Sequence, residues 1–210
     1  RPLSRGLGDV YKRQIDIFPT QIICFNFNKH TKYFFRDPGK IDNTPAGWKC
    51  NVNSSFPRIP DDDALVTPDV RDRLKIDIET ACNAELVREG LMPCEIFTFW
   101  YNVYHDDQSQ ERHDHMDGRR PVFLSGVYYS KNPTPTTFYP TSTHFRSIRY
   151  RGIERSGIRE SMYDLYHFHP TEGQIILFPP YLEHEVLNRQ EHQKPQGRLT
   201  FSFNLVLADA

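Results

Sequence analysis

The spacing of hydrophobic and polar positions changes along the chain. Residues 15–27 alternate and are rich in aromatic side chains, which is typical of one or two β-strands. Residues 36–66 lose this pattern and carry many Pro, Asn, Asp and Gly residues, so we expect an irregular connection there. After Pro93 the chain becomes a series of short apolar runs separated by turn residues.

Residues 68–90 have the spacing of an amphipathic helix. Apolar side chains recur on one face, at Val70, Leu74, Ile78, Cys82 and Leu86. Thr67 is a suitable N-cap, Pro68 fits the first turn, and Gly90 is a typical stop. We therefore expect one or two helices packed on the outside of a sheet.

The β-core is predicted to span about residues 94–207. The strand pattern occurs in residues 95–104, 122–130, 163–170, 174–180 and 198–207. Five or more short strands with turns between them favour a sandwich or barrel. The 15 Phe and 11 Tyr residues favour β-structure over a helical bundle. The predicted fold class is mainly β (α+β), with residues 15–210 as a single domain.

Residues 4–14, SRGLGDVYKRQ, match the translation of a transposase adapter used in DNA sequencing. We therefore treat residues 1–14 as non-native and expect the natural N-terminus to be missing. This segment holds four basic residues and one acidic residue, so 22 basic and 26 acidic residues remain, a net charge of −4. That balance gives no sign of a nucleic-acid partner.

Composition indicates a soluble globular protein, with 38% hydrophobic and 25% charged residues. No apolar run is long enough to span a bilayer. The cysteines form no CxxC pair and are far apart, at Cys24, Cys50, Cys82 and Cys94. Reduced thiols in a cytoplasmic protein are the favoured interpretation.

Two histidines and two aspartates cluster in residues 113–117, HDHMD. If this segment is extended, His113, His115 and Asp117 face the same way. Imidazole and carboxylate groups are the ligands of iron(II) in non-haem oxygenases. A metal site here needs a further ligand from elsewhere in the chain, and a hydrated polar loop is the alternative for this stretch alone.

Two later positions carry related chemistry. His184 follows an apolar strand that ends at Pro179-Pro180, and Arg198 shares a strand face with Thr200. A buried guanidinium needs an anionic partner, and its planar fork fits a carboxylate through two hydrogen bonds. The alternative is an arginine at a strand end that reaches solvent.

The order of these motifs resembles the iron(II)/2-oxoglutarate-dependent oxygenases. HxH or HxD is followed by LSGVYY, then EGQIILFPPYLEH, then RLTFSFN. The likeness is strongest from Trp100 to Asn204, and the best match is a 2OG-Fe(II) oxygenase family with paired histidines before SGVYY. This resemblance implies a double-stranded β-helix, or jelly roll, with a metal at one mouth.

The resemblance also implies roles for individual residues. His184 would supply the last iron(II) ligand, and Arg198 would bind the distal carboxylate of 2-oxoglutarate with Thr200 as a hydroxyl partner.

Further pocket residues are implied in the same way. Asn102 and Tyr104, in WYNVY, match a pair that lines the cosubstrate pocket in related demethylases. Tyr128 is a weaker candidate for the same pocket.

Two ligand sets remain open. One consists of His113, His115 and His184, and the other replaces His113 with Asp117. The family's spacing favours the first set, while a longer stretch after His115 keeps the second in play. Either set needs neutral imidazoles, so we expect metal affinity to weaken below about pH 6.

The implied activity is that of an iron(II)- and 2-oxoglutarate-dependent dioxygenase. It would use O2 to hydroxylate or demethylate an unknown substrate, with succinate and CO2 as co-products. A cupin-type metalloenzyme without 2-oxoglutarate and a non-catalytic jelly-roll binding or structural module are the alternatives. Residues 36–66 and the arginine-rich residues 141–160 are expected to face the substrate, but neither carries a motif that identifies it.

Overall fold

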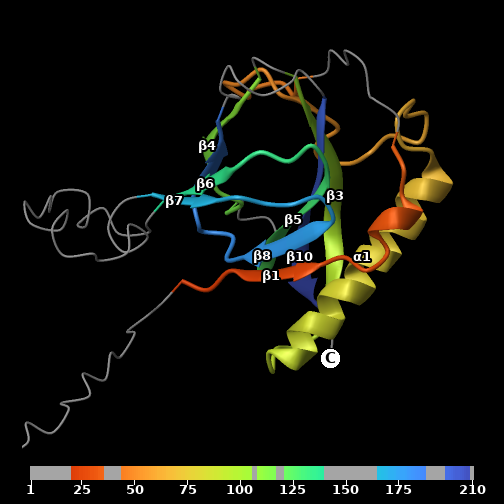
Figure 1. Cartoon of the computed structure of the whole chain (residues 1–210), viewed down its shortest axis with the longest axis vertical. Helices are drawn as coiled ribbons and strands as arrows, with labels where there is room; N and C mark the ends of the chain where they lie inside the picture. The colour runs from red at the N-terminus through yellow and green to blue at the C-terminus, as the bar shows by residue number, and fades with distance from the viewer. Residues whose placement is uncertain are drawn as a thin grey trace, which may run out of the picture.

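The computed structural model describes residues 20–35, 44–105, 108–116, 121–139, 165–187 and 197–208. These residues contain ten β-strands, one α-helix and one short 3-10 helix (Figure 1). The strands are β1 (Ile23–Asn26), β2 (Asn53–Ser54), β3 (Cys94–Tyr104), β4 (Gln110–His113), β5 (Leu124–Lys131), β6 (Thr136–Phe138), β7 (Tyr166–Phe168), β8 (Gln174–Phe178), β9 (His184–Val186) and β10 (Arg198–Leu207). The helices are η1 (His30–Lys32) and α1 (Pro68–Arg88). Residues 1–14, residues 141–160 and Asp117 lie outside the described residues.

The strands form two antiparallel sheets. The larger has the order β1-β8-β5-β10-β3-β2, and the smaller has the order β4-β9-β6-β7. Helix α1 packs on one face of the larger sheet, and the smaller sheet lies on the other side (Figure 1). The predicted mainly β class, with a helix outside the sheets, is therefore confirmed.

Helix α1 begins and ends where the sequence indicates. Its buried side chains are Leu74, Ile78, Cys82 and Leu86, and Val70 packs beside them. Thr67 is the N-cap residue, although its side chain makes no capping hydrogen bond. Gly90 adopts φ +75° and donates its N–H to Val87, while Leu91 donates to Leu86. These two bonds form a Schellman motif, which requires the left-handed backbone that glycine tolerates.

Each of the five predicted β-runs corresponds to a strand, whereas the short strands β2 and β6 were not predicted. The five predicted β-runs overlap β3, β5, β7, β8 and β10, and β3 and β5 each extend one residue beyond their run. Strands β2 and β6 have only two and three residues, too few to show an alternating pattern. No helix in the described part of the chain has the length and apolar character needed to cross a membrane.

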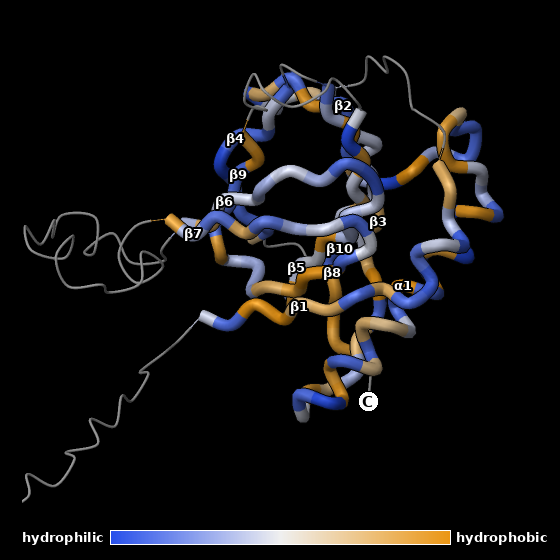
Figure 2. Tube along the Cα trace, in the orientation of Figure 1, coloured by the Kyte–Doolittle hydropathy of each residue, from blue (hydrophilic) through white to orange (hydrophobic). Residues whose placement is uncertain are grey.

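Strand β10 lies between β3 and β5, and its side chains alternate between two environments. Residues 199, 201, 203 and 205 belong to the hydrophobic core against α1. The intervening side chains, together with those of β3, line a pocket between the sheets: Trp100, Asn102, Tyr104, Arg198, Thr200 and Ser202. Hydrophobic residues concentrate along β1, β5 and β8 of the larger sheet, whereas the smaller sheet is more hydrophilic (Figure 2).

Candidate metal centre and cosubstrate pocket

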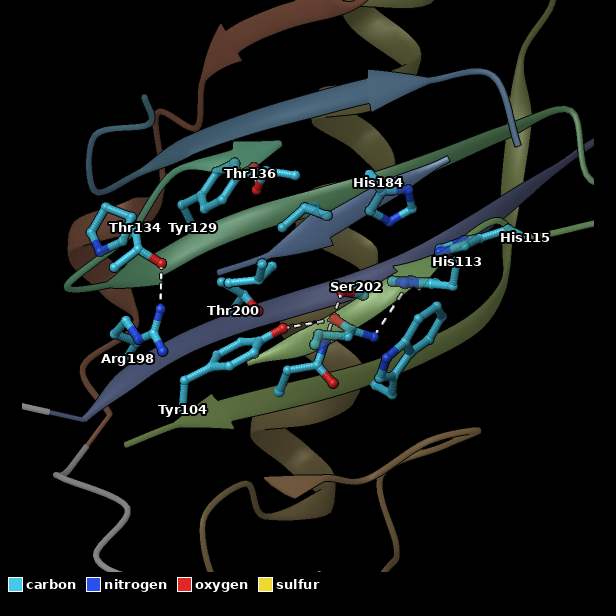
Figure 3. Close-up of a pocket in the computed structure, with 16 residues that line it drawn as sticks. Tyr104, His113, His115, Tyr129, Thr134, Thr136, His184, Arg198, Thr200 and Ser202 are labelled. Atoms are coloured by element: carbon cyan, nitrogen blue, oxygen red, sulfur yellow. Dashed lines mark hydrogen bonds between the residues drawn. The ribbon is translucent and has the colours of Figure 1, made fainter. Parts of the chain in front are cut away.

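Three histidine side chains converge at one end of this pocket (Figure 3). His113 ends β4 and lies directly opposite His184, the first residue of β9. His115 follows β4, and its N–H donates to the carbonyl of Pro180 at 2.9 Å. One ring nitrogen from each histidine lies within 4.8 Å of the others. This spacing allows one metal ion to bind all three.

Hydrogen bonds fix the protonation of each imidazole. The Nδ1 atom of His113 lies 2.8 Å from the carbonyl oxygen of Glu111, and that of His184 lies 3.0 Å from the carbonyl oxygen of Leu182. The Nδ1 atom of His115 lies 2.7 Å from Oδ1 of Asn204. These oxygens accept hydrogen bonds, so each Nδ1 carries the proton and each Nε2 keeps its lone pair. Such outer partners are typical of metal-binding histidines.

Burial keeps the three imidazoles neutral. It lowers the pKa of His115 to about 4 and lowers the pKa values of His113 and His184 below their usual range; the neighbouring histidines add to the effect at His115 and His184. The rings of Phe178 and Trp100 contribute to the apolar surroundings, at 4.8 Å from His184 and 5.8 Å from His115. The expected loss of metal affinity near pH 6 is therefore corrected: in the folded protein, proton competition begins at lower pH.

Arg198 lies at the opposite end of the pocket (Figure 3). It is 1% exposed, which excludes the alternative of an arginine that reaches solvent. Its guanidinium donates to the hydroxyl of Thr134 and, at 2.8 Å, to the carbonyl of Gln108, and it lies over the ring of Tyr104. The pocket therefore combines a fixed positive charge at one end with three neutral nitrogen donors at the other.

The other predicted pocket residues divide into two groups. Asn102, Tyr104 and Thr200 line the pocket, each less than a tenth exposed. Tyr128 does not, and this prediction is wrong: its ring lies in the core on the α1 side, against Phe201. Successive residues of β5 face opposite ways, so the neighbouring tyrosine points into the pocket instead.

Sequence reasoning missed several residues of this pocket. Tyr129 donates or accepts a 2.7 Å hydrogen bond with Thr136 of β6, and Gln110 accepts one of 2.7 Å from the hydroxyl of Tyr104. Ser202 of this pocket, and Asn204, which is hydrogen-bonded to His115, could have been found, since they continue the face of β10 that begins with Arg198. Thr134 and Thr136 gave no signal, because they lie in a loop and a three-residue strand.

Two facing antiparallel sheets, three convergent imidazoles and a buried arginine define a jelly roll with a candidate metal centre at one mouth. A family model described as "Putative 2OG-Fe(II) oxygenase" matches residues 98–204, just over half of the chain. The chain belongs to this family of 2-oxoglutarate- and iron(II)-dependent dioxygenases. Its cofactor is iron(II), and its cosubstrates are 2-oxoglutarate and O2.

Solved structures support the double-stranded β-helix fold. HygX from Streptomyces hygroscopicus, with nickel, 2-oxoglutarate and hygromycin B bound, has a TM-score of 0.52 and 13% identity, over 89% of this chain and 82% of that one. A Pseudomonas putida prolyl-4-hydroxylase has a TM-score of 0.50 and 13% identity, over 79% and 78%. A comparison with curated proteins gave no match. At this identity the structures establish the fold and leave the substrate open.

Proposed function

We propose that His113, His115 and His184 hold the iron(II) and that Arg198 anchors 2-oxoglutarate. The observation that carries this proposal is the single pocket with three convergent imidazoles at one end and a buried guanidinium at the other. An arginine fork fits the distal carboxylate in two hydrogen bonds, and the histidines remain available for the metal.

The protein's own contribution is binding and orientation. Bound iron(II) would supply O2 activation, coupled to the oxidation of 2-oxoglutarate to succinate and CO2. Arg198 fixes one end of the cosubstrate, and the side chains of Asn102, Tyr104 and Thr200 define the space between that end and the histidines. The aromatic walls exclude water and so strengthen the charge contacts inside.

We propose hydroxylation of a C–H bond as the overall reaction. Hydroxylation of a methyl group on nitrogen gives an unstable hemiaminal that releases formaldehyde, so demethylation follows from the same step. Neither Arg198 nor the enclosed pocket beside it is required by a cupin-type enzyme that works without 2-oxoglutarate, and both favour the oxygenase.

Anaerobic titration with iron(II) tests this assignment. Added 2-oxoglutarate should produce a visible charge-transfer band, and His184→Ala should lose both the band and substrate-dependent succinate release. His167→Ala is the matched control, because this histidine lies on β7 and is not among the three convergent ones. A band of full strength in His184→Ala would contradict the proposed ligand set.

A second pair of variants separates the two ligand sets. His113→Ala should abolish iron(II) binding, whereas Asp117→Asn should retain it. The opposite result would transfer the third ligand to Asp117.

We also propose a reducing compartment, such as the cytoplasm. The proposal is supported by four thiols, all free of disulfides, at Cys24, Cys50, Cys82 and Cys94.

A further inference from the structure

A second, more open pocket lies beside the histidines. Its cavity volume is about 230 Å³. It is lined by Trp48, Phe56, Trp100, Gln110, Glu111, His113, Asp114, His115, Met116 and Asn204. Trp100, Gln110, His113 and His115 also line the pocket that contains Arg198. A molecule in the second pocket would therefore reach the histidines from a different side than 2-oxoglutarate.

Aromatic rings form one wall of this second pocket. The ring of Phe56 lies 5.6 Å from that of Trp48 and 5.2 Å from that of Trp100, measured between centroids. Trp100 in turn lies 5.8 Å from His115. Phe56 and Met116 keep 40% and 62% of their surface exposed. Aromatic rings that line a pocket beside the three histidines suit a cation, which is attracted to the face of an aromatic ring.

The charged side chains among the described residues of the second pocket have one sign. Glu111 and Asp114 are its carboxylates, and no lysine or arginine is among the described residues that line it. Both carboxylates are held by backbone donors: Glu111 accepts from the N–H of Lys49 at 2.9 Å, and Asp114 accepts from that of Met116 at 3.0 Å. Fixed carboxylates beside aromatic faces attract cations and repel anions.

Trp100 adds an independent sign that a ligand belongs here. It is 3% exposed, and its indole N–H has no acceptor within the part of the chain that the structure describes. Buried donors of this kind are nearly always satisfied. A bound molecule in either of the two pockets that Trp100 borders could supply the missing acceptor.

We propose that the second pocket binds the prime substrate and selects an organic cation, a guanidinium or an amine. The cation would lie between the aromatic wall and the carboxylates, which places a neighbouring C–H bond beside the histidines. The role as substrate site rests on the proposed iron(II) function; the preference for a cation does not.

The chain's two tryptophans, Trp48 and Trp100, both line this pocket, so their fluorescence reports its occupancy directly. Metal-free protein is titrated with Nα-acetyl-arginine methylamide and with its neutral citrulline analogue, which has nearly the same shape. The arginine probe should give a saturable change in emission, and the citrulline probe should bind at least about fivefold more weakly. Equal affinities, or no saturable change with either probe, would overturn the proposal.

Two variants test the contacts. Glu111→Gln keeps the acceptor for Lys49 but removes the charge, and it should weaken the arginine probe about fivefold without affecting the citrulline probe. Phe56→Leu should also weaken the arginine probe. Glu95→Gln, which removes an exposed carboxylate from β3, is the matched control and should change nothing. An unchanged affinity in Glu111→Gln would contradict the role of the carboxylate.

A third probe identifies the source of the cation. Propylguanidinium carries the same side-chain group without peptide bonds, so equal binding supports a free small molecule, and binding of the acetyl-arginine probe alone supports a peptide side chain. The probe titration contains no metal, so it is independent of iron(II) binding. If the arginine probe binds but iron(II) does not, the preference for a cation stands and the proposed function fails.

Discussion

At the scale of single residues, we expect the buried guanidinium of Arg198 to matter most for the proposed binding of 2-oxoglutarate. Arg198→Lys keeps the charge but loses the fork that pairs with a carboxylate. We expect the Kd for 2-oxoglutarate to rise about 100-fold in Arg198→Ala and less in Arg198→Lys.

Calorimetry with manganese-loaded protein measures this change in affinity. Metal binding itself should remain, because Arg198 and the histidines lie at opposite ends of the pocket (Figure 3). An unaltered 2-oxoglutarate affinity would remove Arg198 from the proposed site.

Asn204 is hydrogen-bonded to His115, one of the proposed iron(II) ligands. Its Oδ1 accepts from the imidazole and, at 2.9 Å, from the hydroxyl of Ser125. We expect Asn204→Ala to weaken iron(II) affinity about 10- to 100-fold, because the ring loses the partner that sets its tautomer. Ser125→Ala should have a smaller effect, since it leaves the contact to His115 in place. Competition with a chelator measures both, and equal affinities would show that this bond is dispensable.

The sequence predicted pocket residues correctly where the alternation of side chains along a single strand was enough to place them. The alternation of β10 indicated that Arg198 and Thr200 share a face, and both line the pocket. The prediction failed at Tyr128, since two adjacent tyrosines give no signal of which one faces inward; that choice depends on how β5 pairs with β10. The resemblance named His113, His115 and Asp117, and only the first two lie in the described residues.

At the scale of elements, the SGVYY stretch of β5 serves both faces of the larger sheet. Ser125 and Tyr129 serve the pocket side, while Tyr128 packs in the core. Gly126 has a different role: a Cβ there would lie 2.2 Å from the ring of Phe203 on the neighbouring strand. The glycine is thus needed for close packing of β5 against β10.

Gly126→Ala should therefore destabilise the protein by about 1–3 kcal/mol, the usual cost of overpacking a core. Backbone strain is not the cause, because Gly126 does not have a positive φ. Urea unfolding measures the change. The double variant Gly126→Ala/Phe203→Leu should be more stable than Gly126→Ala alone, since the smaller side chain leaves room for the methyl group. A fully stable Gly126→Ala would contradict this account.

How well a helix or strand could be predicted from the sequence depended on its length. Helix α1 has 21 residues, with capping signals at both ends, and its limits were close to those expected. Three of the four strands of the smaller sheet have three residues each; only β7 among them lies in a predicted β-run, and the others are defined by their pairing with distant segments. No local pattern encodes that pairing.

At the scale of the whole molecule, the buried histidines make folding sensitive to pH. Their pKa values are depressed in the folded protein, so the unfolded chain binds more protons below its ordinary histidine pKa of 6.5. The metal-free protein should thus be most stable above pH 6.5 and lose stability as the pH falls toward 4. His115 alone contributes about 2 kcal/mol of loss between pH 6.5 and 5.

Urea unfolding of metal-free protein at a series of pH values measures this slope. His115→Asn should reduce it, because that side chain does not titrate. A stability independent of pH between 7 and 5 would show that the histidines are not held neutral by burial.

The three imidazoles are held by different sheets. His113 and His184 face each other across β4 and β9 of the smaller sheet, whereas His115 is bonded to β10 of the larger one. An ion held by all three would act as a cross-link between the two layers. Metal binding would then hold strands β4 and β9 against the larger sheet. Amide hydrogen exchange in these two strands should slow far more than in α1. Iron supply would in this way govern how rigid the enzyme is, and not only whether it turns over.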